Sequence, residues 1–177
     1  MPSFYCGGPS LVENGFRTMN ANRFTLEWET PLGIARATSN GRSLIQLEVE
    51  DGDITQSDTD CLILAQTKSE LSAYFRGELQ SFTVPIDPQG TEFQQKVWEQ
   101  VRSIPFGETL SYGDIANRLQ MKNGQRAVGS ANGDNPIWII IPCHRVIGAD
   151  GGLCGYAGGL WRKQALIGLE SGQMSLL

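Results

Sequence analysis

The chain has 177 residues, a length that suits one ordinary domain or two small ones. Its hydrophobic fraction of 40% and charged fraction of 19% are those of a globular protein and exclude a disordered or fibrous chain. No segment approaches the roughly 18 consecutive apolar residues of a membrane span, and the first residues lack the pattern of a secretory signal. We therefore expect a cytosolic protein without a membrane partner.

The net charge of −5 is unevenly distributed along the chain. Residues 1–90 carry a charge of −6, and residues 91–177 carry a charge of +1. A negatively charged chain repels nucleic acid, which makes extensive contact between the two unfavourable. Any binding of phosphate should therefore be local and should belong to the second half.

The first half has the pattern of a small antiparallel sheet. Residues 1–22 show no periodicity and are interpreted as a loose leader. From residue 24 to residue 29 apolar and polar side chains alternate, which predicts a half-buried strand with Glu27 on its polar face. Two further strands are predicted at 34–38 and 44–49, and the pair Asn40-Gly41 between them is a hairpin signal.

A helix is predicted over residues 62–75, followed by Gly77 as a capping residue. Its apolar residues at helical spacing are Leu62, Ala65, Leu71, Tyr74 and Phe75. The segment 84–90 contains two prolines and a glycine and cannot form a regular element. We place the domain boundary there, with an N-terminal domain at 23–86, a linker at 87–90 and a second domain at 91–177.

The second half has the pattern of several short helices. Thr91 is the expected N-cap of a helix that Pro105 ends, and Ser111 is the expected N-cap of a short helix over 112–119. Another short helix begins near Gln125, so that the pair forms a helix-turn-helix pattern, a weak signal by itself. The apolar run 137–141 is interpreted as a buried strand or extended segment. A last helix is predicted over residues 160–170.

The cysteines are the candidate reactive groups. They lack the spacing of a zinc site, and the chain has a single histidine, so we expect no metal. The four are Cys6, Cys61, Cys143 and Cys154. Although most cysteines are simply buried, Cys143 lies beside that histidine, His144, and beside Arg145, as a thiolate nucleophile requires. In an extended chain His144 would face away from Cys143 and act through a water molecule, with a carboxylate to orient it. No role is assigned to Cys154.

The segment around Cys143 resembles the O6-alkylguanine-DNA alkyltransferases. The resemblance covers residues 91–177 closely and residues 23–86 only loosely. It rests on Pro142-Cys143-His144-Arg145-Val146, Asn135-Pro136, Gly155-Tyr156-Ala157-Gly158-Gly159, Phe106-Gly107-Glu108, Ser111-Tyr112 and Arg126-Ala127-Val128-Gly129. It implies a ribonuclease H-like α/β N-terminal domain, with a small antiparallel sheet plus a helix. A mainly α C-terminal domain with a winged helix-turn-helix-like DNA-binding motif would follow.

The resemblance also implies a function. The protein would flip O6-alkylguanine, and O4-alkylthymine as well, out of the duplex and transfer the alkyl group irreversibly to Cys143. Each molecule would act once, as a monomer without cofactor or obligatory protein partner, bound through the minor groove. Flipping is expected because the alkyl carbon is buried in the base stack, and an inserted side chain can fill the gap that the base leaves.

The site residues follow from the same resemblance. His144 would hold a water between Cys143 and Glu170, Asn135 would hold the turn before Cys143, and Tyr112 would donate to the leaving base. Arg126 would fill the gap in the duplex. The other residues implied in DNA binding are Ala127, Gly129, Ser130, Tyr112 and Arg145, and those implied in the substrate pocket are Tyr156, Val146, Ala157 and Gly158.

The sequence departs from the family pattern at two points, and three other functions remain as alternatives. Ala157 stands where many relatives carry a hydroxyl residue, which puts the substrate range in doubt, and the zinc ligands of some relatives have no counterpart. A non-enzymatic lesion-recognition protein of the same fold would have Trp in place of Cys143. A helix-turn-helix regulator needs a more basic recognition helix, and a thiol hydrolase usually needs a distant histidine.

Overall fold

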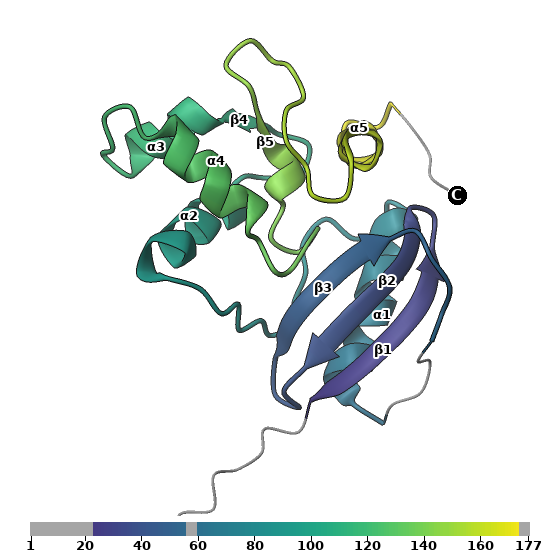
Figure 1. Ribbon diagram of the computed structural model, residues 1–177. Helices are drawn as coiled ribbons and strands as arrows, with labels where there is room; N and C mark the ends of the chain where they lie inside the picture. Colours follow the sequence, from purple (N-terminus) through teal and green to yellow (C-terminus); the bar gives the residue numbers. More distant parts are fainter. Residues whose placement is uncertain (1–22, 56–59, 174–177) are drawn as a thin grey trace, which may run out of the picture.

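The structure is a computed structural model that describes residues 23–55 and 60–173. A sheet with one helix forms the N-terminal half, and a group of short helices forms the C-terminal half (Figure 1). The predicted leader, residues 1–22, lies outside the described residues. Within the described ranges, no helix has the length and apolar character needed to cross a bilayer.

Three antiparallel strands form the sheet in the order β1 (Phe24–Thr30), β2 (Gly33–Ser39) and β3 (Leu44–Glu50). The predicted strands and hairpin are confirmed. The backbone NH groups of residues 42 and 43 donate to Asn40 Oδ1, and Gly41 adopts a φ of +88°, a conformation that favours glycine.

Glu27 departs from the alternating pattern of β1. The sequence predicts it on a polar, solvent-facing surface, but it is only 4% exposed. Arg36 Nε donates to its carboxylate at 2.6 Å, and the Thr55 backbone NH donates at 2.6 Å. The expectation was wrong because the chain after β3 covers this part of the sheet and supplies hydrogen bonds that compensate for burial of the charge.

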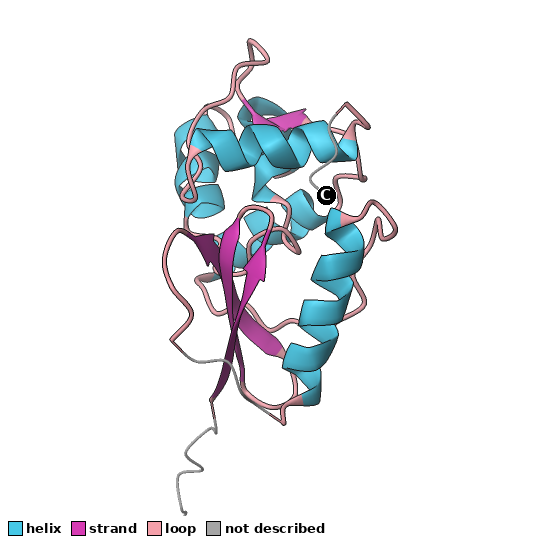
Figure 2. Cartoon of the chain, turned by 90° about the vertical axis from the view of Figure 1, so that its right-hand side faces the viewer, coloured by secondary structure: helices cyan, strands magenta, loops and turns pink. Residues whose placement is uncertain are grey.

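Helix α1 (Leu62–Phe75) packs along one face of the sheet (Figure 2). Its ends are as predicted, with Gly77 at a φ of +72° after the last turn. The predicted buried face is only partly correct, because Leu62 is 84% exposed and Ala65 is exposed. The buried side chains are Leu64, Thr67, Leu71, Tyr74 and Phe75.

The helices predicted in the second half are confirmed. They are α2 (Glu92–Arg102), α3 (Tyr112–Arg118), α4 (Gln125–Gly133) and α5 (Leu160–Glu170). Thr91 and Ser111 each form a capping box. The hydroxyl of the capping residue accepts from the backbone NH of the third helical residue, and the side chain of that third residue accepts from the backbone NH of the capping residue. A short parallel pair, β4 (Leu110–Ser111) with β5 (Val146–Ile147), was not predicted.

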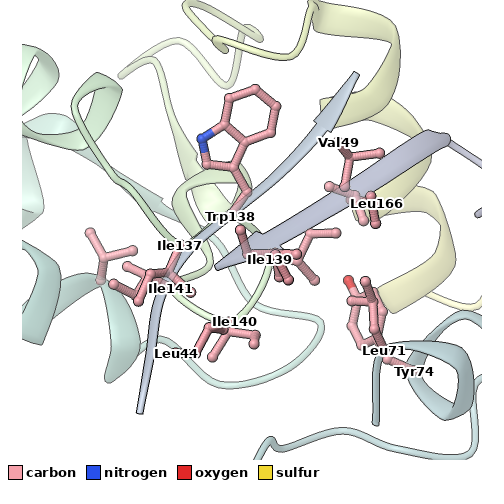
Figure 3. Close-up of a cluster of buried hydrophobic side chains, with 14 of the residues drawn as sticks. Leu44, Val49, Leu71, Tyr74, Ile137, Trp138, Ile139, Ile140, Ile141 and Leu166 are labelled. Carbon is pink, nitrogen blue, oxygen red and sulfur yellow. The ribbon is translucent and has the colours of Figure 1, made fainter. Parts of the chain in front are cut away.

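The apolar run 137–141 is not a strand, which corrects the sequence interpretation. Ile139 has a φ of +71°, and the Ile141 NH donates to the Ile137 carbonyl at 3.0 Å. A left-handed β-branched residue marks a tight loop rather than an extended chain. The isoleucines of this loop enter the core that the two halves share, beside Leu44, Val49 and Leu166 (Figure 3).

The two halves are joined along the edge of β3 and through α5. The Leu47 NH donates to the Pro136 carbonyl at 2.9 Å, and the Trp138 NH donates to the Leu47 carbonyl at 2.8 Å. From α5, buried Arg162 donates to the Leu32 carbonyl at 2.7 Å and to Asp51 at 2.6 Å. The N-terminal half is thereby fixed to the elements that carry Cys143.

We expect Arg162→Ala to lower the free energy of unfolding by about 2–4 kcal/mol, because it removes charged hydrogen bonds and leaves a buried carbonyl unpaired. Asp51→Asn is the matched control. The Asp51 side chain is 83% exposed, and exposed ion pairs contribute up to about 1 kcal/mol. Urea unfolding of both variants measures the difference, and equal losses would contradict a structural role for the Leu32 contact.

Candidate active site

Cys143 begins a single turn of 3-10 helix, Cys143–Arg145, directly after Pro142. Its residue surface is only 5% exposed. The sequence analysis assumed an extended chain here, in which neighbouring side chains point to opposite sides. That assumption was wrong, because the segment is helical. Both side chains are buried, and the turn places them at the junction of the loop 137–141 and α5.

Asn135 holds the loop that precedes the cysteine, as the resemblance implied. Its Nδ2 donates to the Ile141 carbonyl at 2.9 Å, and its Oδ1 accepts from the Ile137 NH at 3.0 Å. Neighbouring Asn132 donates to the Cys143 carbonyl at 3.3 Å. Two buried amides therefore fix the backbone on both sides of the left-handed loop.

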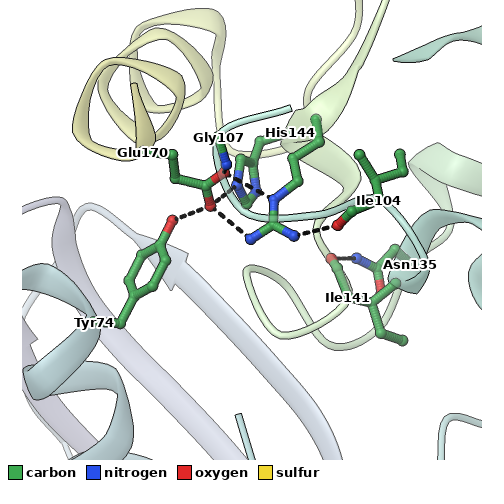
Figure 4. A network of polar contacts seen from close by, with 8 residues as sticks. Tyr74, Ile104, Gly107, Asn135, Ile141, His144 and Glu170 are labelled. Atoms are coloured by element: carbon green, nitrogen blue, oxygen red, sulfur yellow. Dashed lines mark hydrogen bonds and ion pairs between the residues drawn. The ribbon is translucent and has the colours of Figure 1, made fainter. Parts of the chain in front are cut away.

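His144 and Glu170 form a buried pair (Figure 4). His144 Nε2 lies 2.9 Å from Glu170 Oε1, and His144 is fully buried. A carboxylate only accepts hydrogen bonds, so Nε2 carries the proton in the neutral ring. Nδ1 is then an acceptor, and it has no hydrogen-bond partner within the described residues. Burial lowers the pKa of His144 despite the neighbouring carboxylate.

Glu170 accepts hydrogen bonds from several parts of the chain. Arg145 donates from Nε to Oε2 at 2.8 Å and from Nη2 to Oε1 at 2.9 Å. Tyr74 OH donates to Oε1 at 2.7 Å, and the Gly107 NH donates to Oε2 at 3.3 Å. Although burial opposes the charge, the contacts with His144 and Arg145 lower the pKa of Glu170 to about 2, so it is a carboxylate at neutral pH.

The position of Arg145 corrects its assignment as a DNA contact. The residue is 6% exposed, and Nη1 donates to the Ile104 carbonyl at 2.6 Å in addition to the contacts with Glu170. Its guanidinium is occupied inside the protein as the counterion of a buried carboxylate. The DNA contact that the resemblance implied for Arg145 is therefore the wrong role for this residue.

Burial raises the pKa of the Cys143 thiol to about 11, while the Asn135 side chain and the charge of Lys163 act in the opposite direction. Lys163 is itself fully buried. Its Nζ donates to the Val146 carbonyl at 2.6 Å and to the Cys154 carbonyl at 2.9 Å. At neutral pH the resting side chain is accordingly a thiol, and reaction requires an acceptor for its proton.

Tyr112, in the first turn of α3, lies near the same segment. Its OH donates to the Cys154 carbonyl at 3.1 Å. Burial, more than any other cause, raises the pKa of Tyr112 to about 12, so the phenol keeps its proton at neutral pH. A Cβ added at Gly129 of α4 would lie 3.7 Å from the Tyr112 ring, which shows how closely α4 approaches it.

A narrow pocket opens at Cys143, with about 220 Å³ of empty space including its mouth. Its walls are Asn132, Gly133, Trp138, Cys143, Gly155, Tyr156 and Ala157. Of the residues expected in the pocket, Tyr156 and Ala157 line it. Val146 is instead fully buried, and neither it nor Gly158, whose carbonyl accepts from Arg162 at 2.7 Å, is among the wall residues.

The outer face of α4 is composed of small residues and one arginine. Arg126, Ala127 and Ser130 are exposed, and Gly129 is half-buried. Arg126 makes no hydrogen bond or ion pair with any other residue that the structure describes. The geometry therefore leaves a free cation at the start of a helix whose surface another molecule can approach closely.

Sequence reasoning missed Tyr74, Asn132 and Lys163. Tyr74 lies 96 positions before its partner Glu170, and no local pattern connects them. One feature of the sequence could have indicated Lys163: a lysine within the apolar stretch of the last helix is unusual, because a buried lysine needs hydrogen-bond partners. Asn132 had none, since amides are ordinary near helix ends.

Two family models match the chain. The 6-O-methylguanine DNA methyltransferase ribonuclease-like domain matches residues 26–88, and the corresponding DNA-binding domain matches residues 92–172. Together they cover most of the chain, including the sheet, the helical half and the site around Cys143.

Curated relatives and solved structures agree with the family models. A methylated-DNA–protein-cysteine methyltransferase of Mycobacterium leprae is 46% identical over 150 residues, 82% of this chain and 91% of the relative. One of Methanosarcina mazei is 53% identical over 109 residues, 62% of this chain and 69% of the relative. The crystal structure of Mycobacterium tuberculosis OGT in complex with DNA has a TM-score of 0.77 and 43% identity, covering 84% of this chain and 93% of that one. The chain belongs to the 6-O-methylguanine DNA methyltransferase family.

Proposed function

We propose that Cys143 is the residue at which this DNA repair methyltransferase accepts an alkyl group from O6-alkylguanine. The observation that carries the proposal is the arrangement of a pocket-lining thiol beside a buried histidine that a carboxylate orients. In the reaction the bond between sulfur and the alkyl carbon forms as the bond between that carbon and guanine O6 breaks. The product is a thioether, so each molecule reacts once and no cofactor takes part.

The thiol proton needs an acceptor, and His144 is suited to that role. Nδ1 is a buried acceptor atom without a partner, and a water between Nδ1 and Cys143 Sγ would pass the proton to the ring. Nε2–H already points at the Glu170 carboxylate, which stabilises the imidazolium as it forms. The fixed negative charge of Glu170 offsets part of the burial that disfavours a charged histidine.

The leaving group is a guanine anion, and Tyr112 is suited to stabilise it. Its phenol is protonated at neutral pH and donates to a backbone carbonyl of the pocket segment. A turn of this hydroxyl from the carbonyl toward the base would place a hydrogen bond where negative charge develops. Ala157 offers no side-chain hydroxyl in the pocket, so any hydrogen bond from that residue to the substrate must come from its backbone.

DNA would be contacted by α4 through the minor groove. The alkyl carbon is buried in the base stack, so the nucleotide must rotate out of the duplex before the sulfur can reach it. Small residues at 127, 129 and 130 allow close approach of the helix, and Arg126 would occupy the gap and offer several donors to the unpaired base. O4-alkylthymine as a second substrate, a monomeric state and a cytosolic location belong to the same proposal.

Cys143→Ser should abolish transfer of a labelled methyl group, because a serine hydroxyl is far harder to ionise than a thiol. Binding to the damaged duplex should persist, since α4 is unchanged. Cys154→Ser is the matched control and should retain transfer, because the Cys154 side chain is exposed and takes no part in the chemistry. Comparable methyl transfer by the Cys143→Ser variant would show that the acceptor lies elsewhere.

Glu170→Gln should slow transfer and raise the pKa of the reacting thiol, because His144 loses its negative partner. It should also destabilise the protein by about 3 kcal/mol at neutral pH, since the Arg145 charge stays buried without its counterion. The folded pKa of Glu170 is about 2, below its ordinary value of 4.5. The stability difference from wild type should therefore be full above pH 4.5 and shrink as the pH falls toward 2. Urea unfolding across this range measures it, and a difference independent of pH would rule out the carboxylate charge as its source.

Arg126→Ala should hardly affect transfer from free O6-benzylguanine, where no base must be extruded. Transfer from a duplex should fall markedly, because extrusion costs a few kcal/mol and each 1.4 kcal/mol is about tenfold in rate. Single-stranded DNA should give an intermediate loss. Single-turnover rates on the three substrates provide the measurement.

Lys122→Ala, in the exposed turn before α4, is the control for loss of one positive charge. A loss due only to a phosphate contact should shrink at high salt, whereas the effect of Arg126 in the duplex should persist. Equal losses on all three substrates would assign Arg126 to the fold or the pocket instead.

A further inference from the structure

Tyr74 brings the N-terminal half into direct contact with the pair that handles the thiol proton (Figure 4). We propose that Tyr74 is a positioning residue of the alkyl transfer, because its hydroxyl shares the negative charge of Glu170 and thereby limits how strongly His144 holds a proton. The inference rests on the proposed function of Cys143. It gives the N-terminal half a part in the chemistry, beyond support of the second half.

Three donors compete for a single carboxylate oxygen. Tyr74 OH lies 2.7 Å from Glu170 Oε1, His144 Nε2 lies 2.9 Å from it, and Arg145 Nη2 also lies 2.9 Å from it. A carboxylate oxygen offers about two lone-pair positions. Each donor therefore weakens the bonds that the other two make, and removal of Tyr74 OH should strengthen the bond from His144.

The orientation of the carboxylate does not depend on Tyr74. Arg145 holds Glu170 through both oxygens, with Nε on Oε2 at 2.8 Å and Nη2 on Oε1, a forked geometry that fixes the carboxylate plane. The Gly107 NH adds a contact to Oε2 at 3.3 Å. The effect of the tyrosine hydroxyl should consequently be on charge, and only weakly on geometry.

Tyr74 is a permanent donor in this position. The residue is fully buried and packs against Phe75, Phe82 and Phe106. Burial and the charge of Glu170 hold the pKa of its phenol well above the ordinary value, so it keeps its proton over the working pH range.

The titratable groups around His144, apart from Tyr74, come from its own turn and from α5. Arg145 lies on the same turn, Lys163 and Glu170 come from α5, and Cys143 precedes the ring in sequence. Arg145 and Lys163 lower the pKa of His144, and Glu170 raises it. Replacement of Tyr74 by phenylalanine leaves all of these groups in place, so a change in the titration of His144 would report on the lost hydroxyl.

Tyr74→Phe should raise the pKa of His144 by about half a unit to one unit, or about three- to tenfold in proton affinity. A ring with a higher pKa stays protonated, and so cannot accept the thiol proton, up to a higher pH. The acidic limb of the transfer rate from free O6-benzylguanine should therefore move to higher pH. His144 is the only histidine of the chain. Its ring nitrogen signals can therefore be followed without ambiguity in an NMR titration of the full-length protein.

Phe82→Leu is the matched control, because it loosens the packing of the Tyr74 ring and keeps the hydroxyl. It should lower stability without moving the titration of His144 or the pH dependence of transfer. The inference is overturned if Tyr74→Phe leaves both midpoints where they are in the wild type, or moves them no further than Phe82→Leu does. Absence of transfer to Cys143 in the wild type would instead overturn the proposed function, and the titration of His144 separates the two failures.

Discussion

Glu170 accepts hydrogen bonds from Tyr74 of the first half, from Gly107 after α2, and from His144 and Arg145 of the turn that carries the cysteine. A buried carboxylate is costly unless charged and polar partners surround it. These partners come from three separate segments, so the full set of hydrogen bonds to the buried carboxylate forms only when both halves are assembled around α5. The geometry of the thiol chemistry is thus tied to the complete fold.

The residues proposed for the chemistry and those proposed to contact DNA lie in different environments. The thiol, the imidazole and the carboxylate are buried in the protein interior, where electrostatic interactions are strong. The residues proposed to meet DNA lie on the exposed face of α4, where one arginine, which has no partner within residues 23–55 and 60–173, stands among small side chains. The proposal accounts for the action of a chain of net charge −5 on a polyanion, because it confines the contact with DNA to one helix of the less acidic half.

Local rules predicted the elements well, because capping residues and alternation act within a few positions. Thr91, Ser111 and Asn40 each form the local hydrogen bonds expected from the sequence. The failures arose where tertiary contacts decide. Residues 137–141 have the composition of a strand, but Asn135 and the core hold them in a loop. Glu27 and Arg145 carry charges that a sequence places at the surface, and partners distant in sequence draw them inside.

The sequence predicted some residues of the candidate site and missed others. The resemblance named His144, Glu170, Tyr112 and Asn135 as a set, and their roles in the reaction stay predictions. It could not identify Tyr74, whose contact with Glu170 spans 96 positions and depends on how α1 packs. Nor could it show that Val146 and Gly158 lie outside the pocket, since a motif gives the order of residues and says nothing of the direction in which each one faces.

The most direct test is a peptide map of the wild-type protein by mass spectrometry after one turnover with duplex DNA that contains O6-methylguanine. One methyl group should appear on the peptide that carries Cys143, in amount equal to the guanine restored in the DNA, and on no other cysteine. Restoration of guanine with the methyl group on another residue, or with no methyl group on the protein, would contradict the assignment of Cys143 as the acceptor.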